Sequence, residues 1–79
     1  MNKIRVYGTK WCGDCIRAKA FMDNNKISYE WTDVDEESQH RTYIRNLNKG
    51  MERVPTIVFP DGSILVEPTD EELAAKLDL

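Results

Sequence analysis

Short apolar runs alternate with amphipathic stretches along the chain, and their order predicts a mixed α/β fold. Strands are expected over 3–7 and 27–34, and as a hairpin over 56–59 and 64–66. Helices are expected from residue 12 or 13 to 23, from 35 to about 49, and after residue 69, where apolar residues recur every three or four positions. The order βαβαββα predicts a parallel first pair of strands joined by a crossover helix, in a four-stranded mixed sheet flanked by helices.

Capping residues indicate where these helices begin, and apolar stripes indicate which face of each helix is buried. Asp35 is the predicted N-cap of the second helix, and Thr69 with Glu72 forms a capping box for the third. The turn Pro60-Asp61-Gly62-Ser63 has the residues of a tight hairpin. The expected buried positions are Cys15, Ala18 and Met22 on the first helix, Tyr43, Ile44 and Leu47 on the second, and Leu73 and Leu77 on the third.

Both cysteines lie in Trp11-Cys12-Gly13-Asp14-Cys15, between the first strand and the first helix. At a helix N-terminus, free N–H groups and the macrodipole favour a thiolate, so Cys12 is placed to be a nucleophile. Cys15 lies one turn further on the same helix face, where its sulfur can reach that of Cys12. This spacing favours thiol–disulfide exchange, in which Cys12 attacks and Cys15 resolves the mixed disulfide.

Two other uses of a CxxC pair are open on the sequence alone. The cysteines could form a structural disulfide, or they could be half of a zinc site. Zinc needs four ligands, and the only histidine, His40, lies on an expected solvated helix face. Two chains that pooled their Cys12 and Cys15 could still hold zinc or an iron–sulfur cluster. On that same helix, Arg41 and Arg45 are either solvated or hold an anionic partner.

Length and charge narrow the class of protein. A chain of 79 residues is one domain with room for one sheet and a few helices. The net charge of −3 and the lack of a Lys/Arg stripe argue against nucleic-acid binding. No apolar run approaches the ~18 residues of a membrane span, and none resembles a signal peptide. We therefore expect a cytoplasmic monomer, in a reducing compartment where a CxxC pair is more often catalytic than structural.

A second constellation precedes the third strand at Val54-Pro55. Proline supplies no N–H to a sheet, so the pair is either an ordinary strand boundary or a cis peptide bond that turns the backbone of Val54 outward, beside Cys12. Outward backbone groups could pair with an extended substrate. Trp11 offers either an exposed apolar contact beside the sulfur or a half-buried packing residue.

Taken together, these motifs resemble the glutaredoxin family, and the resemblance covers essentially the whole chain. It is carried by Val6-Tyr7, by Cys12 and Cys15 followed by Arg17-Ala18-Lys19-Ala20, by Val54-Pro55-Thr56 and by Asp61-Gly62. The resemblance implies a thioredoxin fold, Cys12 as the nucleophile and Pro55 as a cis-proline. Trp11 before the motif and Gly13 within it are similar to the mycoredoxin subgroup and to thioredoxins.

The chain departs from glutaredoxins at three places. Gly13-Asp14 replaces Pro-Tyr between the cysteines, and Asp14 opposes a thiolate at Cys12 while Lys10 and Arg17 favour it. Thr9 stands where glutaredoxins place a basic residue for a glutathione carboxylate, which leaves Lys10 as the nearest substitute. In the segment that holds the other end of glutathione, Val66-Glu67-Pro68-Thr69-Asp70, only Thr69-Asp70 resembles the family.

The sequence therefore predicts a small thiol–disulfide oxidoreductase that reduces protein disulfides or mixed disulfides between proteins and small thiols. No bound cofactor is expected. The reductant is glutathione, mycothiol, or NADPH with thioredoxin reductase, and the last choice would make the chain an electron donor re-reduced by that enzyme. Besides the catalytic Cys12 and Cys15, the candidate substrate- or thiol-binding residues are Lys10, Trp11, Val54, Pro55, Thr69 and Asp70.

Overall fold

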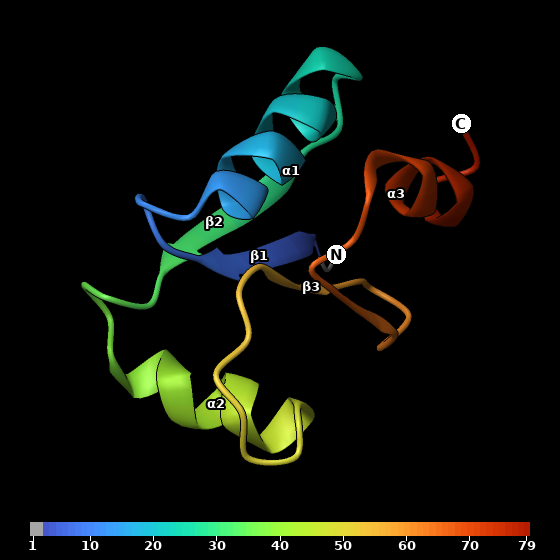
Figure 1. The fold of residues 1–79 in the computed structure, drawn as a ribbon. Coiled ribbons are helices and arrows are strands. Elements are labelled where there is room, and N and C mark those ends of the chain that lie inside the picture. Colours follow the sequence, from blue (N-terminus) through green and yellow to red (C-terminus); the bar gives the residue numbers. More distant parts are fainter. Residues whose placement is uncertain (1–2) are drawn as a thin grey trace.

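A computed structural model describes residues 3–79 and contains all seven expected elements in the expected order (Figure 1). They are β1 (Ile4–Gly8), α1 (Gly13–Asn24), β2 (Tyr29–Asp33), α2 (Gln39–Leu47), β3 (Thr56–Val58), β4 (Ile64–Val66) and α3 (Asp70–Lys76). β2 and β3 are shorter than expected, β1 and β4 have the expected length, and the order βαβαββα is confirmed.

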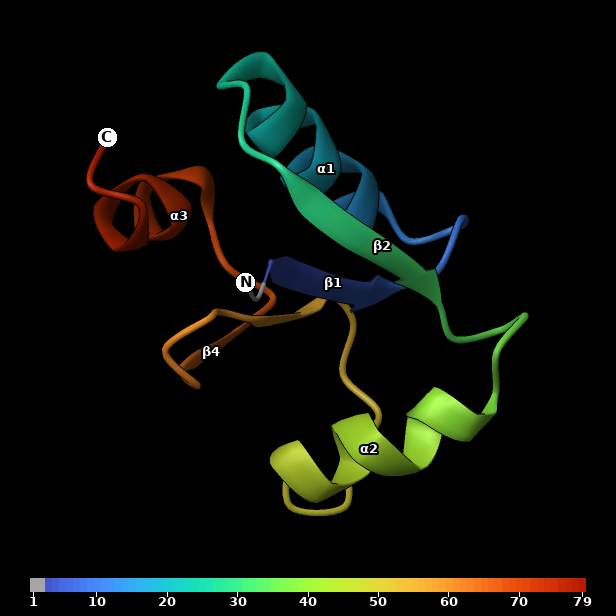
Figure 2. The same ribbon diagram turned by 180° about the vertical axis from the view of Figure 1, so that it is seen from behind.

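The four strands form one mixed sheet in the order β2-β1-β3-β4 (Figure 2). β1 pairs parallel with β2 and antiparallel with β3, and β3 pairs antiparallel with β4. Val6, in the centre of β1, lies opposite both Trp31 of β2 and Ile57 of β3. The parallel pair follows from α1, which carries the chain back across the sheet between β1 and β2.

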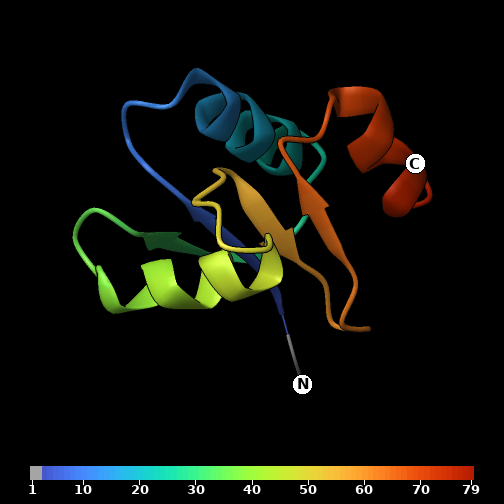
Figure 3. The same ribbon diagram turned by 60° about the horizontal axis from the view of Figure 1, so that its bottom comes forward.

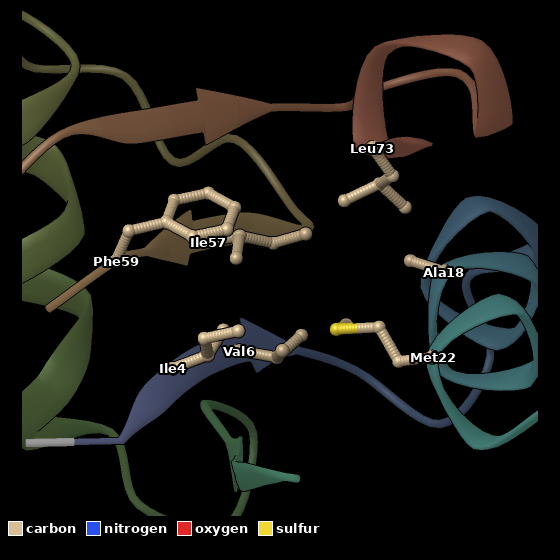
Figure 4. Packing of buried hydrophobic residues seen from close by; sticks show 7 residues of the cluster. All are labelled: Ile4, Val6, Ala18, Met22, Ile57, Phe59 and Leu73. Atoms are coloured by element: carbon tan, nitrogen blue, oxygen red, sulfur yellow. The ribbon is translucent and has the colours of Figure 1, made fainter. Parts of the chain in front are cut away.

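Helices cover both faces of the sheet, with α1 and α3 on one face and α2 on the other (Figure 3). Ala18 and Met22 of α1 and Leu73 of α3 point toward Val6 and Ile57 of the sheet (Figure 4). On the opposite face, α2 contributes to a second cluster, made of Tyr7, Val34, Ile44 and Val58. The predicted buried stripe of α1 is confirmed, and on the other two helices Ile44 and Leu73 are buried while Tyr43, Leu47 and Leu77 are partly buried against the same clusters.

The two predicted N-caps have different outcomes. The capping box of α3 is confirmed: the Glu72 N–H donates to Thr69 Oγ1 at 3.1 Å, and the Thr69 N–H donates to Glu72 Oε1 at 2.8 Å. The Asp35 cap is wrong, because α2 begins later and its N-cap is Ser38. In the turn after β2, the Asp33 carboxylate accepts hydrogen bonds from backbone amides instead, including the N–H of Asp35 at 2.9 Å. Asp35 is thereby left to bind other side chains.

The sequence predicts no membrane-spanning segment, and the structure tests this for its helices. Within residues 3–79, no helix combines the length and the hydrophobicity that a bilayer span requires.

Leu73 tests how much α3 contributes to the core. Its side chain is fully buried, so Leu73→Ala should lower the free energy of unfolding by about 2 to 5 kcal/mol through lost burial and a residual cavity. Leu79→Ala is the matched control, since Leu79 is exposed and should change the free energy by less than ~0.5 kcal/mol. Urea unfolding followed by circular dichroism measures both, and equal losses would show that α3 is not docked as described.

Candidate active site

Cys12 occupies the N-cap of α1, as the sequence predicts. Its backbone is extended, and its carbonyl accepts the first helical hydrogen bond from the Ile16 N–H at 3.1 Å. Cys12 is half-buried and Cys15 is fully buried, and both are free thiols. One sulfur is therefore accessible to a substrate, and the other lies behind it within the first turn of the helix.

Burial raises the pKa of the Cys15 thiol to about 12. The backbone amide of Thr9 opposes this effect, while the hydrogen bond and the charge of Cys12 add to it. Cys15 is consequently a protonated thiol at neutral pH. The raised pKa and the burial of Cys15 leave Cys12 as the more accessible of the two cysteines.

The peptide bond between Val54 and Pro55 is cis, as the sequence hypothesis required. The Cys12 thiol lies 3.8 Å from the Val54 carbonyl oxygen, to which it donates. Pro55 is buried, and its own carbonyl accepts from the Glu67 N–H at 2.9 Å. The ordinary strand boundary is therefore the wrong alternative, and the backbone of Val54 lies beside the exposed sulfur.

The side chains of Trp11 and Lys10 both form hydrogen bonds to the loop between β2 and α2. Trp11 is 73% exposed rather than half-buried, and its Nε1 donates to Asp35 Oδ2 at 2.7 Å. The Lys10 ammonium pairs with Glu36 at 2.9 Å, and this hydrogen bond raises the pKa of Lys10. To bind a substrate carboxylate, Lys10 would have to leave Glu36.

Thr69 and Asp70 are connected to the CxxC helix through Arg17. The Arg17 guanidinium lies 3.0 Å from Asp14 and 3.7 Å from Asp70, and it donates to the Pro68 carbonyl at 3.2 Å. The Thr69 hydroxyl is used by the capping box. The carboxylate of Asp14, within the CxxC motif, is thus paired with a cation of its own helix.

The sequence did not single out a cavity of about 180 Å³ beside Cys12. Its lining combines an apolar part with charged side chains and consists of Thr9, Trp11, Val34, Asp35, Arg41, Ile44, Glu52 and Val54. The Thr9 hydroxyl is buried and has no hydrogen-bond partner among the residues that the structure describes. No sequence signal marks this cavity, because its residues come from four separate segments that meet only in the fold.

Arg41 is the centre of the charged side of this cavity. It pairs with Asp35 and with Glu52, the latter at 3.1 Å, and donates to the Val34 carbonyl at 3.1 Å. Arg45 also reaches Glu52, at 3.3 Å, and these arginines hold the pKa of that carboxyl below its usual range. Carboxylates of the chain itself therefore occupy both arginines, which were predicted to be solvated or to hold an anionic partner.

The metal alternative gains no support from this arrangement. Among residues 3–79, no group of three or more His, Cys, Asp or Glu side chains is placed to hold a metal ion. His40 packs against the ring of Tyr7, with the ring centroids 5.7 Å apart.

A comparison with protein families now assigns the chain: the family model for glutaredoxin matches residues 4–64. The chain belongs to the glutaredoxin family. It is 36% identical to a Mycobacterium tuberculosis protein that is named as a glutaredoxin, over 94% of this chain and 88% of that protein. It is 28% identical to mycoredoxin 1 of Corynebacterium glutamicum, over 99% of this chain and 96% of that protein. The predicted thiol–disulfide oxidoreductase with a CxxC pair is confirmed at this level.

Solved structures show the same fold. A mutant of the thioredoxin-like protein BC3987 superposes with a TM-score of 0.84 at 29% identity, over 99% of this glutaredoxin and 97% of that chain. Glutaredoxin grx-1 of Archaeoglobus fulgidus superposes with a TM-score of 0.82, over 98% of this chain and 87% of that one. At 21% identity, the second likeness shows the fold alone. The thioredoxin fold is confirmed.

The two thiols of this glutaredoxin should differ sharply toward an alkylating agent. With a pKa of about 12, Cys15 is thiolate in only about one molecule in ten thousand at about pH 8, and it is also buried. One equivalent of iodoacetamide should therefore label Cys12 at least ~10-fold more than Cys15, as measured by peptide mass spectrometry. In Cys12→Ser, labelling of Cys15 should still rise as the pH is raised above about 8, with a midpoint below that of the wild-type thiol, because burial remains while the hydrogen bond and the charge of Cys12 are removed. Equal labelling of both cysteines at about pH 8 would contradict this site.

Proposed function

We propose that this glutaredoxin acts by the dithiol route. The Cys12 thiolate attacks a substrate disulfide, which forms a mixed disulfide and releases one substrate thiolate. Cys15 then gives up its proton and attacks the Cys12 sulfur, which forms the Cys12–Cys15 disulfide and releases the second thiolate. Two electrons pass from the protein to the substrate. The observation that carries this proposal is the pair of free thiols at the start of α1, one accessible and one fully buried behind it.

The raised pKa of Cys15 fits the order of the two steps. While Cys12 is free, its hydrogen bond and charge help to keep Cys15 protonated, so Cys15 does not compete for substrate. Once Cys12 is joined to a substrate, its sulfur no longer carries a charge. That contribution to the pKa of Cys15 is then lost, so Cys15 ionises more readily in the state in which it must attack.

The substrate class that we propose is disulfide-containing or thiolated proteins. The Val54 carbonyl lies beside the Cys12 sulfur, so the backbone of Val54 can pair with an extended segment on either side of the substrate cysteine. The exposed ring of Trp11, the residue directly before Cys12, offers an apolar contact to the same substrate. Val54 lies between the solvent-exposed segment 51–53, which precedes it, and the buried Pro55, which follows it and anchors the chain.

For the reductant, we propose a small thiol without a carboxylate, such as the sugar-linked thiol mycothiol, in preference to glutathione. Among residues 3–79, the cationic side chains around the site that could hold a carboxylate are already paired within the chain. Lys10 pairs with Glu36, Arg17 with Asp14 and Asp70, Arg41 with Asp35 and Glu52, Arg45 with Glu52, and Arg53 with Glu67. Glu71 adds a further carboxylate beside Thr69 and Asp70. An anionic thiol would therefore meet net negative charge on the Thr69–Asp70 side of Cys12, and on the Trp11 side it would meet cations that carboxylates already neutralise. The mycoredoxin relative is consistent with this choice.

Serine substitutions test the dithiol route. Cys12→Ser should abolish disulfide reduction, since Ser supplies no thiolate. Cys15→Ser should form the first bond and then stop, which leaves a mixed disulfide on Cys12 that intact-mass spectrometry detects after addition of a disulfide peptide. Ser63→Ala, a change of a side chain in the β3–β4 turn, is the control and should keep full activity. Turnover by Cys12→Ser would overturn the assignment, and turnover by Cys15→Ser would replace the dithiol route by a monothiol one.

The reductant is tested by the rate at which oxidised protein regains its two thiols. We expect recovery with mycothiol to exceed recovery with glutathione at least ~10-fold, and the glutathione rate to rise with ionic strength as repulsion is screened. Asp35→Asn with Glu52→Gln should narrow the difference, because Arg41 is then free for a carboxylate. Faster recovery with glutathione would contradict the charge argument, and recovery only with NADPH and thioredoxin reductase would make the protein a thioredoxin-type electron donor.

A further inference from the structure

Gly8 ends β1 beside the first turn of α1, and its neighbours leave no room for a side chain. A Cβ at this position would lie 2.7 Å from the Cys15 sulfur and 2.7 Å from Cη2 of Trp31, closer than the 3.0 Å that real Cβ atoms respect. Gly8 does not have a positive φ, unlike Gly50 and Gly62, so the requirement for glycine is steric. The absence of this one side chain lets the sulfur and the indole ring approach each other.

Trp31 is held in this place from two sides. On β2 it lies opposite Val6 of β1, and its half-buried ring packs against the core cluster under α1. The Lys19 ammonium lies 4.0 Å from the ring centroid, as a cation–π contact. Lys19 follows Cys15 by one helical turn, so the same helix supplies both the sulfur at one end of the ring and the cation over its face.

We infer that Trp31 is a positioning residue for the resolving step: its ring edge, facing the Cys15 sulfur across Gly8, confines that sulfur to the approach toward Cys12. The inference rests on the dithiol route proposed above. Sulfur packs favourably against aromatic edges at about 5 Å, and an aromatic wall also keeps water from the thiol. Full burial of Cys15 agrees with a closed pocket around its side chain.

The geometry matters because the second step is an attack within one molecule. Such a reaction gains its speed from holding the reacting atoms in near-attack positions, and a displacement of about 1 Å can cost about 100-fold in rate. Without the ring, the Cys15 side chain could turn into the vacated space. Its sulfur would then be easier to reach from outside and less often aligned with the Cys12 sulfur.

The experiment compares the internal and the external reaction of the same sulfur. The Cys12 thiolate attacks Ellman's reagent, which forms a mixed disulfide with thionitrobenzoate on Cys12 and releases a first thionitrobenzoate anion. Attack by Cys15 on the Cys12 sulfur then forms the Cys12–Cys15 disulfide and releases a second anion, so the second phase of absorbance gives the internal rate. The external rate is the alkylation of Cys15 by iodoacetamide in a Cys12→Ser background, measured across pH. A changed thiolate fraction moves both rates alike and cancels in their ratio, and a fall in the internal rate itself separates lost alignment from mere exposure of the sulfur.

We expect Trp31→Leu to lower the ratio of internal to external rate at least ~10-fold. Tyr29→Leu is the matched control, because Tyr29 is a half-buried aromatic packed against the same cluster from two positions earlier on β2, and its ratio should stay within about twofold. An unchanged ratio in folded Trp31→Leu would overturn the inference, as would an equal fall in Tyr29→Leu. Neither outcome bears on the dithiol route, which the serine variants decide.

Trp31→Phe and Gly8→Ala keep the inference testable if Trp31→Leu does not fold. Phenylalanine lacks the outer ring atoms that approach Gly8, so Trp31→Phe should lower the ratio in the same direction by a smaller factor. Gly8→Ala places a methyl group between the Cys15 sulfur and the Trp31 ring, and should also lower the ratio of internal to external rate. In Trp11→Phe, where Trp31 is the only tryptophan, closing the Cys12–Cys15 disulfide should change the fluorescence; identical spectra of the oxidised and reduced forms would contradict the contact.

Discussion

The packing of the α1 stripe against the sheet is the constraint on which the site depends. Cys15, Ala18 and Met22 are each almost entirely buried, and the last two lie against Val6 and Ile57 of the sheet. Because Cys15 belongs to this stripe, the depth at which α1 docks fixes how far its sulfur lies from solvent. The same docking places the helix N-terminus, and with it Cys12, at the carboxyl end of β1, where a substrate can approach.

The loop before β3 completes the site, and side chains on its inner side hold it. Thr56 is fully buried, and its hydroxyl donates to the Arg53 carbonyl at 2.6 Å. Asn48, at the end of α2, donates in turn to Thr56 Oγ1 at 3.1 Å. These bonds join the two ends of segment 48–56 to each other and hold Arg53 against Thr56, the first residue of β3. The Val54 carbonyl is thus presented to Cys12 by a fastened loop rather than by a free one.

Charge around Cys12 is balanced within the protein. The Asp35 carboxylate binds both Trp11 and Arg41, and Glu52 pairs with both Arg41 and Arg45. Asp14 pairs with Arg17. Exposed ion pairs of this kind contribute little to stability, about 0 to 1 kcal/mol each. Their effect is on recognition, because an anionic ligand must displace a partner to find a cation. Under the proposed function, shape, backbone pairing and the apolar Trp11 ring are left to select the substrate.

Local signals in the sequence determined the seven elements, the capping box at Thr69, the CxxC pair at a helix start and the hairpin turn between β3 and β4. Each depends on residues at most a few positions apart, and so the chain alone specifies it. Asp35 does not cap α2, which begins at Gln39 after Ser38, because the Asp35 carboxylate binds the distant side chains of Trp11 and Arg41, and these contacts leave no local signal.

Only the tertiary structure decided which distant residues meet. The cavity beside Cys12 joins Asp35 to Glu52, and the steric need for Gly8 joins Cys15 of α1 to Trp31 of β2. Strand register, helix docking and side-chain packing set such contacts, and no local pattern encodes them. The sequence by itself therefore determined the reacting atoms, and the packing of α1 on the sheet decided what surrounds them.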